Sequence, residues 1–230
     1  MENTKIISLG GSIVAPGDVD LKLLKELKSA IEEYLDAEGS RRLILIVGGG
    51  GPARAYQEAY REIVGAPDNE MQDWIGIAAT RLNAQLLAGI FQDHCSTPVV
   101  TDPTAGFSFE GRILVAAGWK PGFSTDFDAV LLAERFGADT VINLSNITKV
   151  YSEDPKKNPD ARPLDSVSWK DFVKLVGEEW TPGKNLPFDP VATKKASELG
   201  LRVIVASGRD IENVRGILEE KAFEGTVIGR

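Results

Sequence analysis

Short runs of apolar residues alternate along the chain with stretches in which apolar residues recur every three or four positions. The runs predict buried strands, and the recurring pattern predicts amphipathic helices. The expected strands are residues 6–9, 43–47, 98–100, 113–115, 140–144, 202–205 and 226–228. The expected helices begin after Asp20, near Pro52, at Thr125, after Asp189 and after Asp210, and Met71, Trp74, Ile75, Ala78, Leu82 and Leu86 mark one more.

This alternation of strands and helices predicts an α/β fold, because nearly continuous apolar strands need cover on both faces. We expect a mainly parallel sheet between two layers of helices, a three-layer αβα sandwich. No linker-like segment interrupts the pattern, so residues 1–230 form a single expected domain. The Pro-, Asp- and Lys-rich segment 154–163 predicts an exposed loop or hairpin. Thr125 and Asp128 have the spacing of a capping box, and Gly137 predicts the end of that helix.

The composition disfavours several kinds of partner and site. The formal net charge is −8, which disfavours nucleic acid and membrane surfaces as partners, since both attract basic faces. One cysteine, Cys95, forbids an internal disulfide and favours a reducing, cytoplasmic compartment. With only one histidine, His94, the chain cannot build a typical zinc site, and no metal-ligating residue is assigned. The first residues lack the pattern of a signal peptide.

Two glycine clusters follow predicted strands, where ligands bind in open parallel sheets. Gly10 and Gly11 precede Ser12, and four glycines at 48–51 precede Arg54 by a few residues. Glycine lets backbone N–H groups approach a phosphate, and a following helix adds its positive end. The alternative is that each cluster is a tight turn without a ligand. Neither cluster is a P-loop, and the second is not a G-x-G-x-x-G motif.

Two further features carry two interpretations each, and a third carries one. The segment 118–126 brings two hydroxyl groups to a helix start, where Ser124 or Thr125 could bind a ligand or simply cap the helix. Asp73 fits either a cap or an acceptor for ribose hydroxyls. Asp189 before Pro190 fits an N-cap.

Taken in order, these pieces resemble the amino acid kinase superfamily, and within it the archaeal-type uridylate (UMP) kinases. The matching stretches are residues 8–12, 47–50 with Ala53 and Arg54, 73–77 with 80–84, 121–122 with 124–126, Asn146 with 150–151 and 154–155, and 189–190 with Ala192 and Lys194. They span nearly the whole chain. The resemblance implies the αβα fold of that superfamily, ATP and Mg²⁺ as cofactors, UMP as the acceptor, and a homo-oligomer, usually a hexamer.

The resemblance also implies roles for individual residues. It places Arg54 and Asp189 in catalysis, with Arg54 on the transferring phosphate and Asp189 orienting catalytic cations. It places the ATP site at Gly11, Ser12, Gly50, Arg54, Ser145, Asn146, Tyr151 and Asp154. It places the UMP site at Gly49, Asp73, Trp119, Lys120, Pro121, Gly122, Phe123, Ser124 and Thr125, with Asp73 on the ribose.

The chain departs from the superfamily pattern at three places. Ser8 stands where many members have lysine, Thr148-Lys149 replaces the usual Asp-Gly, and Trp119-Lys120 replaces small or polar residues. We hypothesise that Lys120 or Lys149 supplies the charge missing at position 8; the alternative is that both are solvated. Two other functions stay open: the same fold acting on a carboxylate, carbamate or another phosphomonoester, and a non-catalytic nucleotide- or oxyanion-binding protein.

Overall fold

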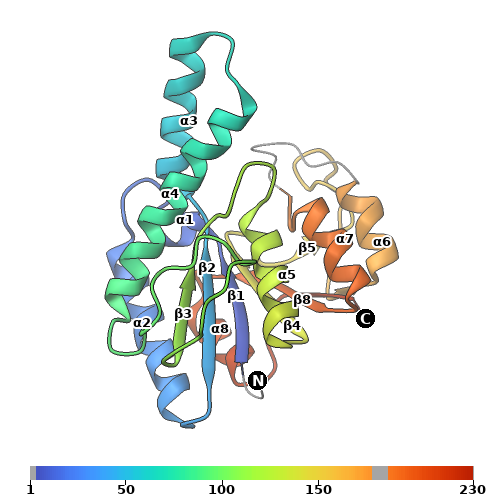
Figure 1. The fold of residues 1–230 in the computed structure, drawn as a ribbon. Coiled ribbons are helices and arrows are strands. Elements are labelled where there is room, and N and C mark those ends of the chain that lie inside the picture. The colour runs from blue at the N-terminus through green and yellow to red at the C-terminus, as the bar shows by residue number, and fades with distance from the viewer. Residues whose placement is uncertain (1–3, 178–185, 230) are drawn as a thin grey trace.

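The computed structural model describes residues 4–177 and 186–229, and its centre is a seven-stranded sheet (Figure 1). The strands follow the spatial order β3-β2-β1-β4-β8-β9-β7, and neighbours are parallel except for β9, which runs antiparallel to β8. Their bounds are β1 Thr4–Leu9, β2 Arg42–Val47, β3 Ile113–Ala116, β4 Thr140–Ser145, β7 Ser166–Val167, β8 Arg202–Ser207 and β9 Thr226–Ile228. The expected α/β fold with a mainly parallel sheet is confirmed.

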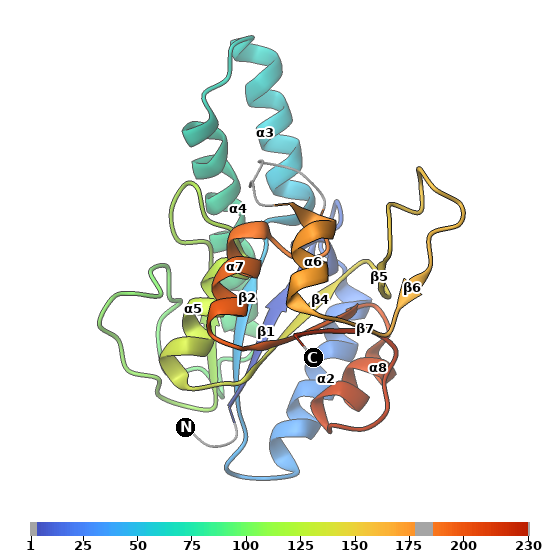
Figure 2. The ribbon, with the colours of Figure 1, turned by 90° about the vertical axis from the view of Figure 1, so that its right-hand side faces the viewer.

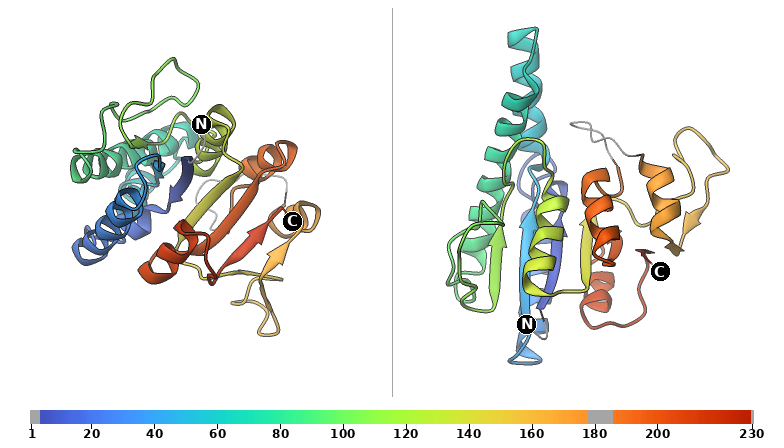
Figure 3. Two further views of the ribbon diagram at one scale, coloured as in Figure 1. Left: turned by 90° about the horizontal axis from the view of Figure 1, so that it is seen from below. Right: turned by 45° about the vertical axis from the view of Figure 1, so that its right-hand side comes forward.

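Helices cover both faces of this sheet, as the view along the sheet in Figure 3 shows. One face packs against α2 (Leu21–Asp36), α8 (Ile211–Leu218) and part of α4 (Asn69–Ile90). The other packs against α5 (Thr125–Phe136), α6 (Trp169–Val176) and α7 (Pro190–Glu198). The remaining helices are α1 (Gly11–Val14) and α3 (Gly50–Val64).

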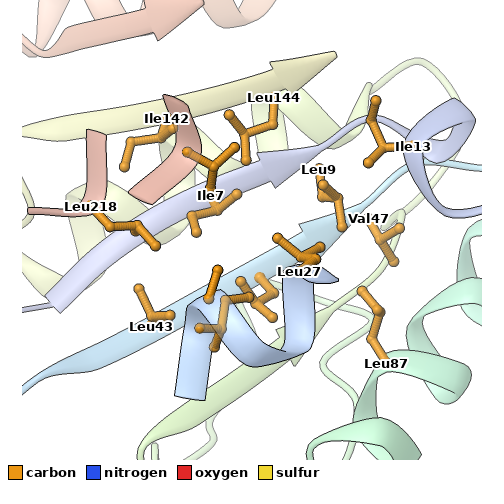
Figure 4. Packing of buried hydrophobic residues seen from close by; sticks show 14 of the residues in the cluster. Ile7, Leu9, Ile13, Leu27, Leu43, Val47, Leu87, Ile142, Leu144 and Leu218 are labelled. Atoms are coloured by element: carbon orange, nitrogen blue, oxygen red, sulfur yellow. The ribbon is translucent and has the colours of Figure 1, made fainter. Parts of the chain in front are cut away.

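The strands are buried on both faces, because successive residues of a strand pack into the two apolar clusters on opposite sides of the sheet. Ile7 and Leu9 of β1 pack in the cluster under α2, whereas Ile6 packs in the cluster under α5. Figure 4 shows the first cluster, in which Leu27 and Leu87 reach the sheet from α2 and α4. This two-sided burial explains why the strands read as nearly continuous apolar runs.

The strand register brings the loops of the two glycine clusters to one edge. Leu9 pairs with both Val47 and Leu144, so β1, β2 and β4 end at the same level. From this edge α3 and the first half of α4 project away from the sheet as a helical hairpin (Figures 1 and 2). The carboxyl ends of the central strands therefore lie at the foot of that hairpin.

The segment 154–163 lies in the expected excursion. It connects β5 (Val150–Tyr151) to β6 (Pro163–Leu164), which pair antiparallel as a separate small sheet. In Figure 2 this hairpin stands off from the body of the molecule. Within the described ranges, no helix has both the length and the apolar content that crossing a membrane requires.

Two expectations about local structure are wrong. Residues 98–100 form no strand: only an isolated bridge joins Val100 to Ala116, and Pro98 has no N–H to extend it. The capping box of Thr125 and Asp128 does not form either. Ser124 is the N-cap, its hydroxyl accepting from Phe127 N, while Asp128 is buried. Asp128 lies four residues after this N-cap, on the face of α5 that is turned toward the interior.

Candidate functional site

The two glycine loops lie in direct contact at the carboxyl ends of β1 and β2. A Cβ atom on Gly11 would lie 2.1 Å from the backbone nitrogen of Gly50 and 2.5 Å from the carbonyl of Gly48. Gly50 also has a positive φ of 66°. Close packing of two backbones thus accounts for glycine at these positions, in addition to any role toward a phosphate. Both loops face the same end of the sheet.

Arg54 joins the two loops. From the first turns of α3 its guanidinium donates to the Ser12 hydroxyl at 3.0 Å and to the Pro16 carbonyl at 3.0 Å. A second guanidinium, that of Arg209 after β8, donates to the carbonyl of Ser12 at 3.1 Å. The structure therefore brings the predicted residues Ser12 and Arg54 together. It adds Arg209, which the sequence signalled only by its place after a predicted strand.

The second glycine loop is fixed from α4. The buried side chain of Asn83 donates from its amide nitrogen to the carbonyl oxygens of Gly48 at 2.8 Å and Gly49 at 3.2 Å. These two hydrogen bonds tie the carbonyl groups of the glycine loop to α4. A rigid loop of this kind suits a site that works by positioning.

Asp73 and the segment 118–123 also come together. The Asp73 carboxylate accepts a hydrogen bond from the Gly122 amide at 2.8 Å, and burial raises the pKa of Asp73 above its ordinary value. The Arg81 guanidinium donates to the Trp119 carbonyl at 3.2 Å, and the Thr80 hydroxyl accepts from the Gly118 amide at 2.8 Å. Helix α4 thus holds this segment along its length, and Asp73 acts on the loop rather than as a helix cap.

The same segment carries an aromatic stack. The ring centroids of Trp119 and Phe123 are 5.2 Å apart, and those of Phe123 and Phe127 are 4.7 Å apart. The Lys120 ammonium lies 3.8 Å from the centroid of the Trp119 ring, a cation–π contact. Lys149 forms an ion pair with Asp165 at 2.5 Å. The hypothesis that Lys120 or Lys149 supplies phosphate-facing charge stays a prediction, since neither contact directs the ammonium toward the glycine loops.

Two carboxyl groups lie close together below the glycine loops, at the starts of α5 and α7. Asp126 accepts from the Ser8 hydroxyl at 2.8 Å, from the Asn143 side chain at 3.3 Å and from the Asp189 amide at 3.3 Å. Burial raises the pKa of Asp126 to about 6, and the carboxyl group of Asp189 adds to the rise while the Ser8 hydrogen bond opposes it. Asp126 belongs to the quoted 124–126 motif, but its place between Ser8 and Asp189 could not be read from sequence.

Asp189 is the N-cap of α7, as one of its two interpretations held. One carboxylate oxygen accepts from the Ala192 amide at 2.7 Å. The other, Oδ2, is buried and has no hydrogen-bond partner within the described residues. Burial raises the pKa of Asp189, and hydrogen bonds from the backbone and from Ser124 oppose the rise. A cap can also face a ligand, so the two interpretations do not exclude each other.

The residues assigned to the ATP nucleoside divide into two groups. Ser145 ends β4 beside the first glycine loop, whose Gly10 amide donates to the Leu144 carbonyl at 2.8 Å. Asn146 follows it. Tyr151 and Asp154 lie farther along, on β5 and in the excursion, and Asp154 accepts from the Lys156 amide at 2.9 Å within its own turn. Over the described ranges, no hydrogen bond or ion pair links these two to the glycine loops.

Comparisons with known proteins identify the family of this chain. The sequence model of the amino acid kinase family matches residues 3–207. The chain belongs to this family. Among its relatives, a uridylate kinase of Methanospirillum hungatei is 36% identical over 99% of this chain and 95% of its own length. A uridylate kinase of Methanocorpusculum labreanum is 37% identical over 97% and 94% of the two chains.

A solved family structure gives the same result for the fold. The crystal structure of uridylate kinase from Archaeoglobus fulgidus superposes with a TM-score of 0.80 at 32% identity, covering 97% of this chain and 99% of that one. The resemblance to the amino acid kinase family, and to its archaeal uridylate kinase branch, is therefore confirmed.

Proposed function

We propose that this chain is a nucleoside monophosphate kinase, which transfers the γ-phosphoryl group of ATP to UMP and yields UDP and ADP. The observation that carries the proposal is the convergence, at one sheet edge, of two interlocked glycine loops, the Arg54 guanidinium and the loop 118–123. Relatives named uridylate kinase, which match almost the full length of the chain, support it.

The residues at the site suit a reaction that needs no general base. A nucleotide phosphate has a second pKa of about 6, so the acceptor oxygen is already anionic at neutral pH. Catalysis then rests on holding two anionic groups in line and on stabilising charge in the transition state. Arg54 is the residue we assign to the transferring phosphate. Its two hydrogen bonds to Ser12 and Pro16 hold the guanidinium between the loops.

For the donor, we assign ATP phosphates to Gly11, Ser12 and Gly50, and the ATP nucleoside to Ser145, Asn146, Tyr151 and Asp154. For the acceptor, we assign UMP to Gly49, to Asp73 and to Trp119, Lys120, Pro121, Gly122, Phe123, Ser124 and Thr125. The donor and acceptor sets meet at the second glycine loop, because Gly49 and Gly50 are neighbours at the start of α3, the helix that carries Arg54.

The residues present fit a nucleotide-bound Mg²⁺. Such an ion is held mainly by phosphates and water, with one or two carboxylates. Asp189 offers a buried carboxylate oxygen without a partner in the described part of the chain, and Asp126 lies beside it. No cluster of three or more acidic, histidine or cysteine side chains exists among the described residues, so the protein alone does not form a metal cage. When bound, Mg²⁺ would neutralise charge on the phosphate oxygens.

The wider assignments are also proposals. We place the reaction in the cytoplasm, in keeping with the single cysteine, and treat residues 1–230 as one domain built on one main sheet. We propose a homo-oligomer, a hexamer by resemblance. It is supported by exposed apolar side chains that gather on α3 and α4, namely Tyr56, Ile63, Val64, Met71, Trp74, Leu82 and Leu86.

The test is a product assay with ATP and Mg²⁺, in which UMP, CMP and acetylglutamate are offered separately. We expect UDP and ADP to form with UMP at the highest kcat/KM. Turnover of acetylglutamate but not UMP would overturn the acceptor and favour the carboxylate alternative. If no acceptor is turned over but nucleotides raise the melting temperature, the non-catalytic alternative replaces ours, because a ligand that binds only the folded state stabilises it.

A further inference from the structure

Asp128 is a buried carboxyl group without a cationic partner among the residues that the structure describes. Its side chain is 0% exposed, and the charged groups that act on it, Asp126 and Asp102, are both acidic. Oδ2 accepts a hydrogen bond from the Trp119 amide at 3.1 Å, while Oδ1 has no partner among the described residues. Burying a carboxyl group in this way costs stability. The hydrogen bond to the Trp119 amide is the one that this carboxyl group makes within the described residues.

That hydrogen bond joins two parts of the molecule. Asp128 lies on α5, which packs against β1, β2 and β4, and Asp126 lies two residues earlier on the same helix. Trp119 begins the loop that carries the acceptor assignments. The other anchors of this loop, Asp73, Thr80 and Arg81, all lie on α4. In the described chain, Asp128 is the side chain whose hydrogen bond ties the loop to α5, where Phe127 also stacks on Phe123 of the loop.

A second carboxylate lies beside the same tryptophan. The Thr104 hydroxyl, and to a lesser extent the Trp119 side chain, whose indole N–H is its only donor, lower the pKa of Asp102. The loop around Asp102 is itself fixed to α5, because Arg135 donates to the carbonyls of Pro103 at 3.1 Å and Ala105 at 2.6 Å. Trp119 is thus tied to α5 through its backbone, and its ring lies beside a loop that α5 also holds.

We propose that Asp128 is a positioning residue for the acceptor nucleotide: its hydrogen bond fixes the Trp119 backbone to α5, so that the loop 118–123 keeps the shape that receives the acceptor. The inference rests on the proposed function. Preorganising a binding loop raises affinity because less conformational freedom is lost on binding. Asp128 therefore acts on the affinity for the acceptor and leaves the donor site unchanged.

Two substitutions separate the hydrogen bond from the charge. Asp128→Val removes the acceptor for the Trp119 amide in a similar volume, whereas Asp128→Asn keeps a carbonyl oxygen that can accept it. Glu134→Gln is the control on the same helix, where Glu134 pairs with Lys195 instead of the loop. For each protein, the Kd for UMP and for ATP would be measured by calorimetry, together with KM and kcat.

We expect Asp128→Val to weaken UMP binding about tenfold, the effect of losing one anchoring hydrogen bond. Its ATP affinity should stay within about twofold of wild type, and Asp128→Asn should restore UMP binding. If Asp128→Val does not fold, Asp128→Ala removes the same acceptor without adding bulk and should weaken UMP binding to the same extent.

Unchanged UMP affinity in these variants, or equal weakening of ATP and UMP, would overturn the inference. So would an Asp128→Asn variant as impaired as Asp128→Val. A wild-type chain that neither binds nor phosphorylates UMP would overturn the proposed function first, and the inference with it; the measurement on wild type alone distinguishes the two failures.

Discussion

At the scale of single residues, Arg54 shows how much depends on one guanidinium. It reaches from α3 to the Ser12 hydroxyl and the Pro16 carbonyl, and so bridges the two glycine loops. Position 8, where many superfamily members have lysine, holds Ser8, which donates to Asp126. A serine at this position supplies no positive charge below the loops. More of the phosphate charge must therefore be neutralised by Arg54.

We expect Arg54→Ala to lower kcat/KM about 100-fold or more, the loss typical of removing one preorganised donor from a charge-stabilising site. Arg61→Ala is the matched control two turns later on α3, where Arg61 pairs with Glu58. That variant should retain activity. The check is steady-state kinetics with UMP and ATP, with thermal unfolding to show that both variants fold. Equal activity of Arg54→Ala and Arg61→Ala would remove Arg54 from the mechanism.

The buried carboxyl group of Asp128 predicts a pH dependence of stability. Burial raises its pKa from the ordinary 3.8 to about 7 in the folded chain. Between these values the unfolded chain ionises while the folded chain holds its proton, so the free energy of unfolding falls as the pH rises from about 4 to 7. A shift of this size corresponds to roughly 4 kcal/mol at most.

Asp128→Asn removes this titration. Its free energy of unfolding should exceed that of wild type by more at pH 8 than at pH 5, measured by urea unfolding at both values. Asp93→Asn, which makes the same substitution at an exposed acid, is the matched control. A pH-independent effect of Asp128→Asn would mean that Asp128 does not titrate in this range.

At the scale of elements, the sequence predicted most of the sheet, because parallel strands buried on both faces leave nearly continuous apolar runs. It was less informative where one side chain serves a distant partner. Asp128 fits a capping box by spacing, yet its carboxyl group faces Trp119. Likewise Met71 and Leu82 mark a helix correctly, but both side chains are exposed on it. Such choices depend on tertiary neighbours, which local spacing does not encode.

The glycine loops show the same limit. Their positions could be read from the sequence, but the reason for glycine could not, because it lies in the approach of two segments about 40 residues apart.

We expect Gly11→Ala to destabilise the fold by about 1–3 kcal/mol, the usual cost of overpacking, since the new Cβ would lie 2.1 Å from Gly50 N. Urea unfolding would measure this cost.

The control for Gly11→Ala is Gly39→Ala, at a glycine whose Cβ would meet no atom within 4 Å. That variant should unfold within about 0.5 kcal/mol of wild type, as surface substitutions usually do. If Gly11→Ala is as stable as Gly39→Ala, the two loops do not need their close approach.

At the scale of the whole molecule, apolar surface is unevenly distributed. Among the described residues, seven of the twelve exposed large apolar side chains lie on α3 and α4, five of them on the hairpin that projects from the body (Figure 1). Ile63 is 84% exposed and Leu82 67%. Exposed apolar side chains gathered on two neighbouring helices favour a protein interface there. A second copy of this chain is the partner we expect, in keeping with the proposed homo-oligomer.

The double variant Ile63→Lys with Leu82→Lys should therefore dissociate the oligomer, because a charge buried in an apolar interface without a partner opposes association. Light scattering after size exclusion should find wild type at a multiple of 24.9 kDa and the variant nearer to that mass. Val19→Lys with Leu21→Lys is the matched control, since it changes two exposed apolar residues, 41% and 68% exposed, at the start of α2. If both double variants keep the mass of wild type, the subunits associate through another surface; if wild type itself is monomeric, the exposed side chains on the hairpin do not bring copies of the chain together.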